Sequence, residues 1–362
     1  MMMEDRISLL PDVLLHHILS TLNTKCVVQT CVLSKRWKTL WTHIPTLNFD
    51  YNSYSSSLSS FKDNDDEAKE KSFKYFIFRV LSKHCTTNIH KLTYTTSQNE
   101  DELVLVEFLI CYAGSRNVQQ LCINTYDTIG IYDWNYCFSV CSSLIGLKMV
   151  CAFVHDWGVL AIPSLKILEI ECDWYERDKE ANYKGITMFP GCPNLESLVL
   201  VDYLFESSTI SAPKLKNLKL CASPRMELTF PEVELFTPTL ETVNFINVLP
   251  IVKSDSEFSC IHKVDIQLKD SIFERVGSQT QKLKSNFREL LSVFHNARSF
   301  TLPLKATLVI SLYDELFFHN MSHLRLKTKE SGLLLEHLLK APKLKTFVVL
   351  NEDKEDIKNC MG

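Results

Sequence analysis

An apolar pattern recurs along most of this chain and constrains its fold more than any other feature. Each copy places apolar residues at its first, fourth and sixth positions, and the last two alternate with an outward residue as in a β-strand. Twelve copies can be aligned: Ile44-Leu47-Phe49, Ile89-Leu92-Tyr94, Val118-Leu121-Ile123, Leu144-Leu147-Met149, Leu165-Leu168-Ile170, Leu195-Leu198-Leu200, Leu215-Leu218-Leu220, Leu240-Val243-Phe245, Ile261-Val264-Ile266, Ala297-Phe300-Leu302, Met321-Leu324-Leu326 and Leu344-Phe347-Val349. Such repetition predicts stacked units, each of which contacts its neighbours.

Helix-like stretches fill the longer gaps between copies. Apolar residues at helical spacing precede the Phe300 strand, over 283–294, and residues 332–340 precede the Phe347 strand in the same way. A strand followed by a helix, stacked many times, gives a parallel inner sheet with helices outside. The alternative is an unrelated α/β domain in which the runs coincide by chance. The stretch of about 50–71 is rich in Ser, Asn, Asp and Glu and is expected to be a flexible loop.

The first 45 residues carry three short helix signals. Leu10-Pro11-Asp12 opens the first helix, since proline suits the first helical turn. Thr24 is expected to cap the second helix and Ser34 the third. The third helix then presents Trp37, Leu40 and Trp41 on one face, with Lys35, Arg36 and Lys38 turned to water. So small a unit cannot bury all its apolar residues internally, so the surplus is expected to meet a partner or the rest of the chain.

This N-terminal run resembles the F-box, in the plant form that begins Asp-Arg-Ile-Ser. The match rests on Leu10-Pro11, the helix order and Leu33-Ser-Lys-Arg-Trp37-Lys-Thr-Leu-Trp41. Asn23 departs from the family pattern, which usually has proline there. The alternative is an ordinary helical cap on a larger domain. The stretch from Trp41 to Phe49 holds no Gly or Ser, so a rigid join to the first repeat is expected.

The repeats resemble the degenerate leucine-rich repeats that follow plant F-boxes. The phrases FPGCPNLESLVL, ISAPKLKNLKL and APKLKTFVVL carry this resemblance. It implies an α+β chain with a small all-α F-box module at 1–45 and an irregular leucine-rich-repeat α/β solenoid at 46–362. Many relatives add an FBD segment, which we do not expect here because the chain stops soon after the Phe347 copy.

Composition argues against some classes of function and indicates the cellular compartment. A formal net charge of −4 argues against a general nucleic-acid binder. The 13 cysteines include no C-x-x-C pair, which favours free thiols in a reducing compartment. No signal peptide is visible, and the longest apolar run, 103–113, is too short to span a bilayer. We therefore expect a cytoplasmic or nuclear protein without membrane contact.

Enzyme motifs are missing from the sequence. Its nine glycines form neither a phosphate-binding loop nor a dinucleotide fingerprint, and no nucleophile elbow is present. His16 and His17 are neighbours on a helix and point about 100° apart, so they do not pair as metal ligands. We expect no catalytic residue, no metal and no cofactor.

The resemblance implies the substrate-recognition subunit of an SCF-type (Skp–cullin–F-box) E3 ubiquitin ligase. The F-box would bind a Skp-type adaptor, and through it a cullin–RING ligase, while the repeats recruit a protein target for ubiquitination. The alternative is a leucine-rich interaction scaffold without a ligase role, and an enzyme is a distant third.

The adaptor-binding residues are predicted from the apolar positions of the motif. They are Leu10, Pro11, Leu15, Ile18, Leu19, Val28, Leu33 and Trp37. Leu14, Leu22 and Leu40 are expected to be internal instead.

A target-binding surface is predicted on the outward strand positions, most of which are polar or mixed in charge. The exception is the pair Val199 and Val201, with Ile246 in the same column and charged residues on the flanking strands. The insertion 172–184 adds Trp174 nearby. An apolar spot rimmed by charge is typical of a binding centre, so Trp174, Val199, Val201 and Ile246 are the candidates. The alternative is that the insertion simply covers the valines.

Overall fold

A computed structural model describes residues 7, 9–56, 66–96, 103–129, 135–152, 160–172, 186–202, 207–223, 230–255, 257–269, 280–303, 320–328 and 345–351. The chain divides into two compact units. Unit 1 comprises residues 1–155, 160–165 and 170–176, and unit 2 comprises residues 156–159, 166–169 and 177–362. Each unit is described by itself below.

Unit 1 begins with short helices. They are α1 (Asp12–Leu19), α2 (Thr24–Gln29) and α3 (Trp37–Leu40), with 3-10 turns η1 (Thr30–Val32) and η2 (Trp41–His43). Pro11 precedes α1 as expected. The predicted caps of the other two helices are wrong. Asn23 caps α2, because its side chain accepts a hydrogen bond from the Cys26 amide, and α3 begins at Trp37 without any side-chain cap.

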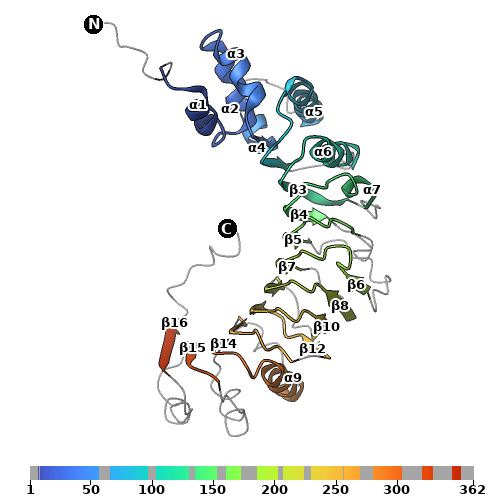
Figure 1. Ribbon diagram of the computed structural model, residues 1–362, viewed down its shortest axis with the longest axis vertical. Helices are drawn as coiled ribbons and strands as arrows, with labels where there is room; N and C mark the ends of the chain where they lie inside the picture. Colours follow the sequence, from blue (N-terminus) through green and yellow to red (C-terminus); the bar gives the residue numbers. More distant parts are fainter. Residues whose placement is uncertain are drawn as a thin grey trace, which may run out of the picture. The chain divides into compact units, whose positions relative to one another are not determined.

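Strands and further helices complete unit 1. Strands β1 (Thr46–Asp50), β2 (Lys91–Thr95), β3 (Gln120–Ile129) and β4 (Gly146–Ala152) pair in this order, all in parallel. Helices α4 (Tyr51–Ser55), α5 (Asp66–Lys83), α6 (Leu103–Ser115) and α7 (Asn135–Phe138) connect them. In Figure 1, α5, α6 and α7 follow one another along one side of the strands. The expected loop of about 50–71 is therefore partly helical, in α4 and the first turns of α5; its residues 57–65 lie outside the described ranges.

Unit 2 continues the parallel pairing. Its strands β7 (Ser197–Val201), β9 (Asn217–Cys221), β11 (Thr242–Ile246), β13 (Lys263–Gln267), β14 (Ser299–Pro303), β15 (His323–Thr328) and β16 (Thr346–Asn351) pair in this order, and β5 (Ile167–Glu171) lies where the two units divide. Within the described ranges, a strand therefore lies at every one of the twelve predicted copies. The parallel repeat architecture is confirmed.

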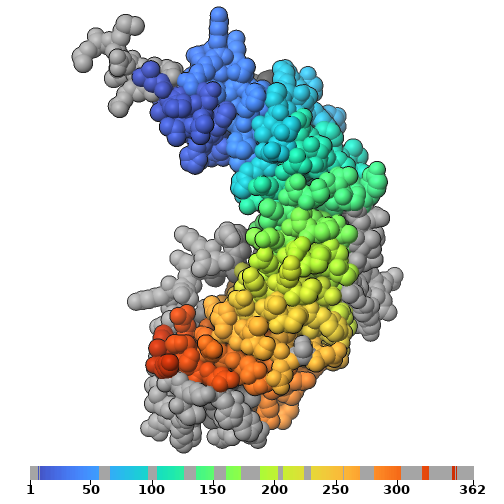
Figure 2. Space-filling model, in the orientation of Figure 1, coloured from blue at the N-terminus to red at the C-terminus, as the bar shows by residue number. Residues whose placement is uncertain are grey.

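Burial follows the repeat pattern strand by strand. On β7, Leu198 and Leu200 are buried, whereas Val199 between them is only half-buried. The same alternation holds on β2, where Leu92 and Tyr94 are buried. In Figure 2 the colour advances steadily within each unit, so segments that follow one another in sequence lie side by side. This arrangement is the usual one for a solenoid.

Helices are predicted on the outer side of the inner sheet, but this prediction is wrong for most of the described part of unit 2. A second parallel sheet stands there, with strands in the order β12 (Ile251–Lys253), β10 (Glu232–Phe236), β8 (Ser207–Ser211) and β6 (Ile186–Met188). Figure 1 shows these strands along one side of β7, β9, β11 and β13. Only α9 (Thr280–Val293) is a helix among the described connections of unit 2, and it begins close to the predicted helical stretch. The predicted helix at 332–340 lies outside the described residues.

Candidate functional site

The helical module of unit 1 exposes an unusual amount of apolar surface. Val13 is 77% exposed and Val32 is 82% exposed. The exposed large apolar residues of this module are Ile7, Leu9, Val13, Leu14, Ile18, Leu22, Val32 and Leu33. Single exposed apolar residues are normal, but a concentration within so few residues is typical of an interaction site.

The predicted adaptor-binding residues fall into two groups. Pro11, Ile18 and Leu33 are exposed, and Leu10 and Val28 are half-buried. These five are available to a partner. Leu15, Leu19 and Trp37 are instead buried inside the module, at 5% exposure or less. We therefore expect them to affect adaptor binding only by stabilising the fold of the module.

The expectation that Leu14 and Leu22 are internal is wrong. Leu14 is 48% exposed and Leu22 is 41% exposed, whereas Leu40 is buried as expected. Leu14 and Leu15 are neighbours in sequence, so they point about 100° apart on the helix, and only Leu15 reaches the core. Leu14 and Leu22 therefore join the exposed residues that a partner could contact.

Arg36 holds the start of α1 against the start of α3. Its guanidinium donates a hydrogen bond of 2.6 Å to the Leu10 carbonyl and one of 2.8 Å, through Nε, to the Asp12 carboxylate. The nitrogen that donates to Leu10, Nη2, also forms an ion pair with Asp12. The sequence predicts that Arg36 is turned to water, but in the structure its side chain is bound to these two partners. No local signal could show this, because the partners lie more than twenty residues away and only the packing of α1 on α3 brings them together.

Hydrogen bonds join the helical module to the first strand. The Asn48 amide donates to Thr24 Oγ1 at 2.7 Å, and Thr46 Oγ1 donates to the Ser20 carbonyl at 3.1 Å. Buried His84, at the end of α5, contacts the Ile44 carbonyl through Nε2 at 3.0 Å. Burial lowers the pKa of His84, so the neutral ring is favoured there. These contacts support the expected rigid join between the helical module and the first strand.

The predicted target surface lies on the outward positions of unit 2. Val199, Val201 and Ile246 are each half-buried. The register places Val201 beside Cys221, and Cys221 beside Ile246, so an apolar column runs across three strands. Cys221 was missed because a lone cysteine in a strand gives no signal of its own. Trp174 lies outside the described residues.

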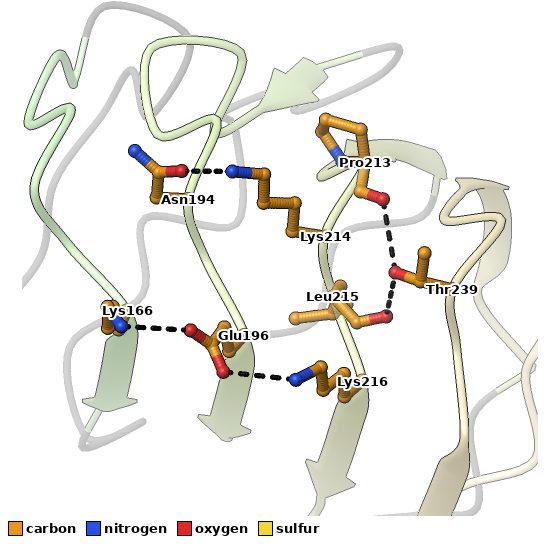
Figure 3. A network of polar contacts seen from close by, with 8 residues as sticks. All are labelled: Lys166, Asn194, Glu196, Pro213, Lys214, Leu215, Lys216 and Thr239. Atoms are coloured by element: carbon orange, nitrogen blue, oxygen red, sulfur yellow. Dashed lines mark hydrogen bonds and ion pairs between the residues drawn. The ribbon is translucent and has the colours of Figure 1, made fainter.

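Charged side chains line the beginnings of the strands in unit 2. Lys166 and Lys216 both form ion pairs with Glu196, which lies between them on the neighbouring strand, at 3.2 and 3.4 Å (Figure 3). These hydrogen bonds and charges lower the pKa of the exposed Glu196 carboxyl. Beside them, Thr239 Oγ1 donates to the carbonyls of Pro213 and Leu215. Because the pairs are exposed, they add little stability.

The described side chains offer little for catalysis. No group of three or more His, Cys, Asp or Glu residues within the described ranges is placed to hold a metal ion. Burial raises the pKa of Cys137 to about 12 and that of Cys141 to about 11. Both thiols are therefore protonated near neutral pH, and a protonated thiol is a poor nucleophile. In the same part of the chain, no helix is long and apolar enough to cross a membrane.

The fold and these surfaces together define a leucine-rich-repeat protein with a helical N-terminal module. Residues 7–48 match the family model "F-box domain". An F-box/LRR-repeat protein of Arabidopsis thaliana is 30% identical over 60% of this chain and 67% of its own length. An F-box/FBD/LRR-repeat protein of the same plant is 26% identical over 97% of this chain and 81% of its own length. Another F-box/LRR-repeat protein of the plant is 27% identical, covering 90% of this chain and 85% of the relative. The chain belongs to the F-box/LRR-repeat protein family.

Proposed function

We propose that this chain is the substrate-recognition subunit of an SCF-type E3 ubiquitin ligase. Its F-box, residues 1–45, docks on a Skp-type adaptor and through it on a cullin–RING ligase. Its repeats, residues 46–362, recruit a protein target for ubiquitination. The chain contributes no catalytic residue of its own. It acts by raising the concentration of the target near the ubiquitin-loaded partner enzyme.

One observation supports this proposal above the others: apolar side chains of the F-box face solvent. Ile18 is 45% exposed and Leu33 is 64% exposed, yet both belong to the F-box match. If the module served only to cap the repeats, these side chains should be turned inward. Exposing them is unfavourable by about 25 cal/mol for each Å² of apolar surface, and an adaptor that covers them would offset this.

We propose that target binding is centred on four residues, which are Trp174, Val199, Val201 and Ile246. The apolar column through Cys221 and the paired charges of Lys166, Glu196 and Lys216 support this proposal, since they give an apolar centre with a charged edge. We place the activity in the cytoplasm or nucleus. Within the described ranges the cysteines are free, which fits a reducing compartment.

The adaptor role is tested by co-expressing the chain with a plant Skp-type adaptor and purifying the pair. The double variant Ile18→Asp, Leu33→Asp should lose at least tenfold in adaptor affinity, because it places two charges on the proposed contact. Both side chains are exposed, so the fold should be unaffected. The matched control is Val104→Asp, Val140→Asp, which changes two exposed apolar residues on and after other helices of unit 1. The assignment is wrong if the double variant binds the adaptor as well as the control does.

The alternative is an interaction scaffold without a ligase role. The same experiment separates the two, since a scaffold would fail to co-purify with the adaptor while remaining folded and soluble. If the adaptor binds but the repeats recruit nothing that becomes ubiquitinated, the scaffold reading is favoured as well. Proximity labelling with the proteasome inhibited would then show which proteins surround the chain.

A further inference from the structure

The strands of unit 2 begin in one regular ladder. In the larger sheet, from β7 to β16, two successive amides at the start of each strand donate to a single carbonyl at the start of the strand before it. Thus Arg298 and Ser299 donate to the His262 carbonyl, and Ser322 and His323 donate to the Arg298 carbonyl. Lys345 and Thr346 continue the ladder by donating to the Ser322 carbonyl. Side chains at these positions therefore form a row along one edge of the sheet, about 4.8 Å apart from strand to strand.

The sign of the charged side chains alternates in the first part of this row and is only positive in the second. In its first part the signs alternate, and Lys166, Glu196 and Lys216 neutralise one another in ion pairs (Figure 3). Glu241 is the next residue in the row. Beyond Glu241, the two residues at the start of each of the four strands from β13 to β16 are basic or neutral. We call this second part the basic rim, and it consists of His262, Lys263, Arg298, His323 and Lys345.

The basic rim is exposed, and among the described residues its side chains form no ion pair. All five side chains are exposed. None of them forms an ion pair with another residue of the described part of the chain, and Arg325, on β15 nearby, adds a further exposed cation. Like charges on neighbouring strands repel and destabilise a sheet. The first part of the row relieves such repulsion with Glu196, whereas the rim lacks an acidic residue at the equivalent positions.

We propose that the basic rim is a second binding surface, which takes an extended acidic segment of a protein partner. Lying across the strands, such a segment would supply the negative charges that this part of the row lacks. The rim spans three steps between strands, or about 14 Å. An extended chain covers this distance in roughly four to five residues, so the segment needs an acidic run of that length. That the segment belongs to a recruited target rests on the proposed function, whereas binding at the rim does not.

Fluorescence anisotropy with a labelled heptaglutamate peptide and the full-length chain tests the inference. Wild type should bind the heptaglutamate peptide at low salt and more weakly as the salt concentration rises. It should not bind a heptaglutamine peptide. The triple variant Lys263→Glu, Arg298→Glu, Lys345→Glu should reduce affinity at least tenfold. The chain offers a matched control, Lys83→Glu, Lys91→Glu, Lys214→Glu, which makes the same change in net charge at three exposed lysines outside the basic rim. The control should stay within twofold of wild type.

Three results would overturn the inference: no binding by wild type, an equal loss in both triple variants, or tighter binding of single-stranded DNA of the same charge at the same residues. If a triple variant fails to give a normal thermal unfolding transition, the glutamine versions of the same positions replace it. Adaptor co-purification of each variant runs in parallel. If wild type binds the adaptor but not the peptide, only the proposed binding at the basic rim is refuted. If wild type binds the peptide but not the adaptor, only the ligase role is refuted.

Discussion

Asn247 shows how one side chain ties three neighbouring repeats together. It is 4% exposed and its backbone has a φ of 55°, a conformation that Asn tolerates better than most residues. Its side chain donates to the Ala222 carbonyl at 3.1 Å and accepts from the Lys269 amide at 3.1 Å. Both partners lie just beyond the ends of adjacent strands, so this one amide fixes where those strands stop.

Replacing Asn247 with alanine should lower the free energy of unfolding by roughly 2–4 kcal/mol, because the buried Ala222 carbonyl and the part-buried Lys269 amide lose their partner. Urea denaturation followed by circular dichroism measures this loss. Asn244→Ala on the same strand is the control, since Asn244 Oδ1 has no hydrogen-bond partner among the described residues. Equal losses in the two variants would show that the hydrogen bonds of Asn247 are not the cause.

At the scale of single elements, the strands could be predicted and the outer layer could not. Strands such as β7 can be predicted from the sequence, because apolar residues at alternate positions, here Leu198 and Leu200, face the core. Strand β8 is Ser-Ser-Thr-Ile-Ser, and nothing in that composition distinguishes it from a loop. It becomes a strand only because β6 and β10 pair with it on either side. The exposed face of the F-box could not be fully predicted either. Helical spacing alone does not decide whether Leu14 or Leu15 faces inward.

The join between α5 and β1 makes stability depend on pH. Burial is the main cause of the lowered pKa of His84, with Arg116 and His43 adding repulsion, and the hydrogen bond to the Ile44 carbonyl opposes the shift. A histidine with a lowered folded pKa stabilises the fold fully above its unfolded pKa of about 6.5, and this stability is lost as pH falls from there toward the folded value. We predict that wild type loses more stability between pH 7.5 and pH 5.5 than the His84→Gln variant does. Thermal melts across this range measure it, and parallel curves for the two proteins would contradict the prediction.

At the scale of the whole molecule, the chain carries three separate proposed surfaces: the apolar F-box face, the column through Val201 and Ile246, and the basic rim. Repeat proteins suit such separation, because each repeat contacts only its neighbours and a distant surface can change without disturbing the others. The proposed ligase role depends on the F-box face. Its exposed side chains are spread over residues 7–33, so a bound adaptor should cover that whole stretch.

Hydrogen–deuterium exchange of the full chain, with and without the Skp-type adaptor, tests whether the F-box is the docking module. We expect the adaptor to slow exchange in peptides from residues 7–45. We expect no change in peptides from β7, β9, β11, β13 and β14, which carry the other two surfaces. Slower exchange confined to the repeats, or no change anywhere at saturating adaptor, would contradict the claim that the F-box is the docking module.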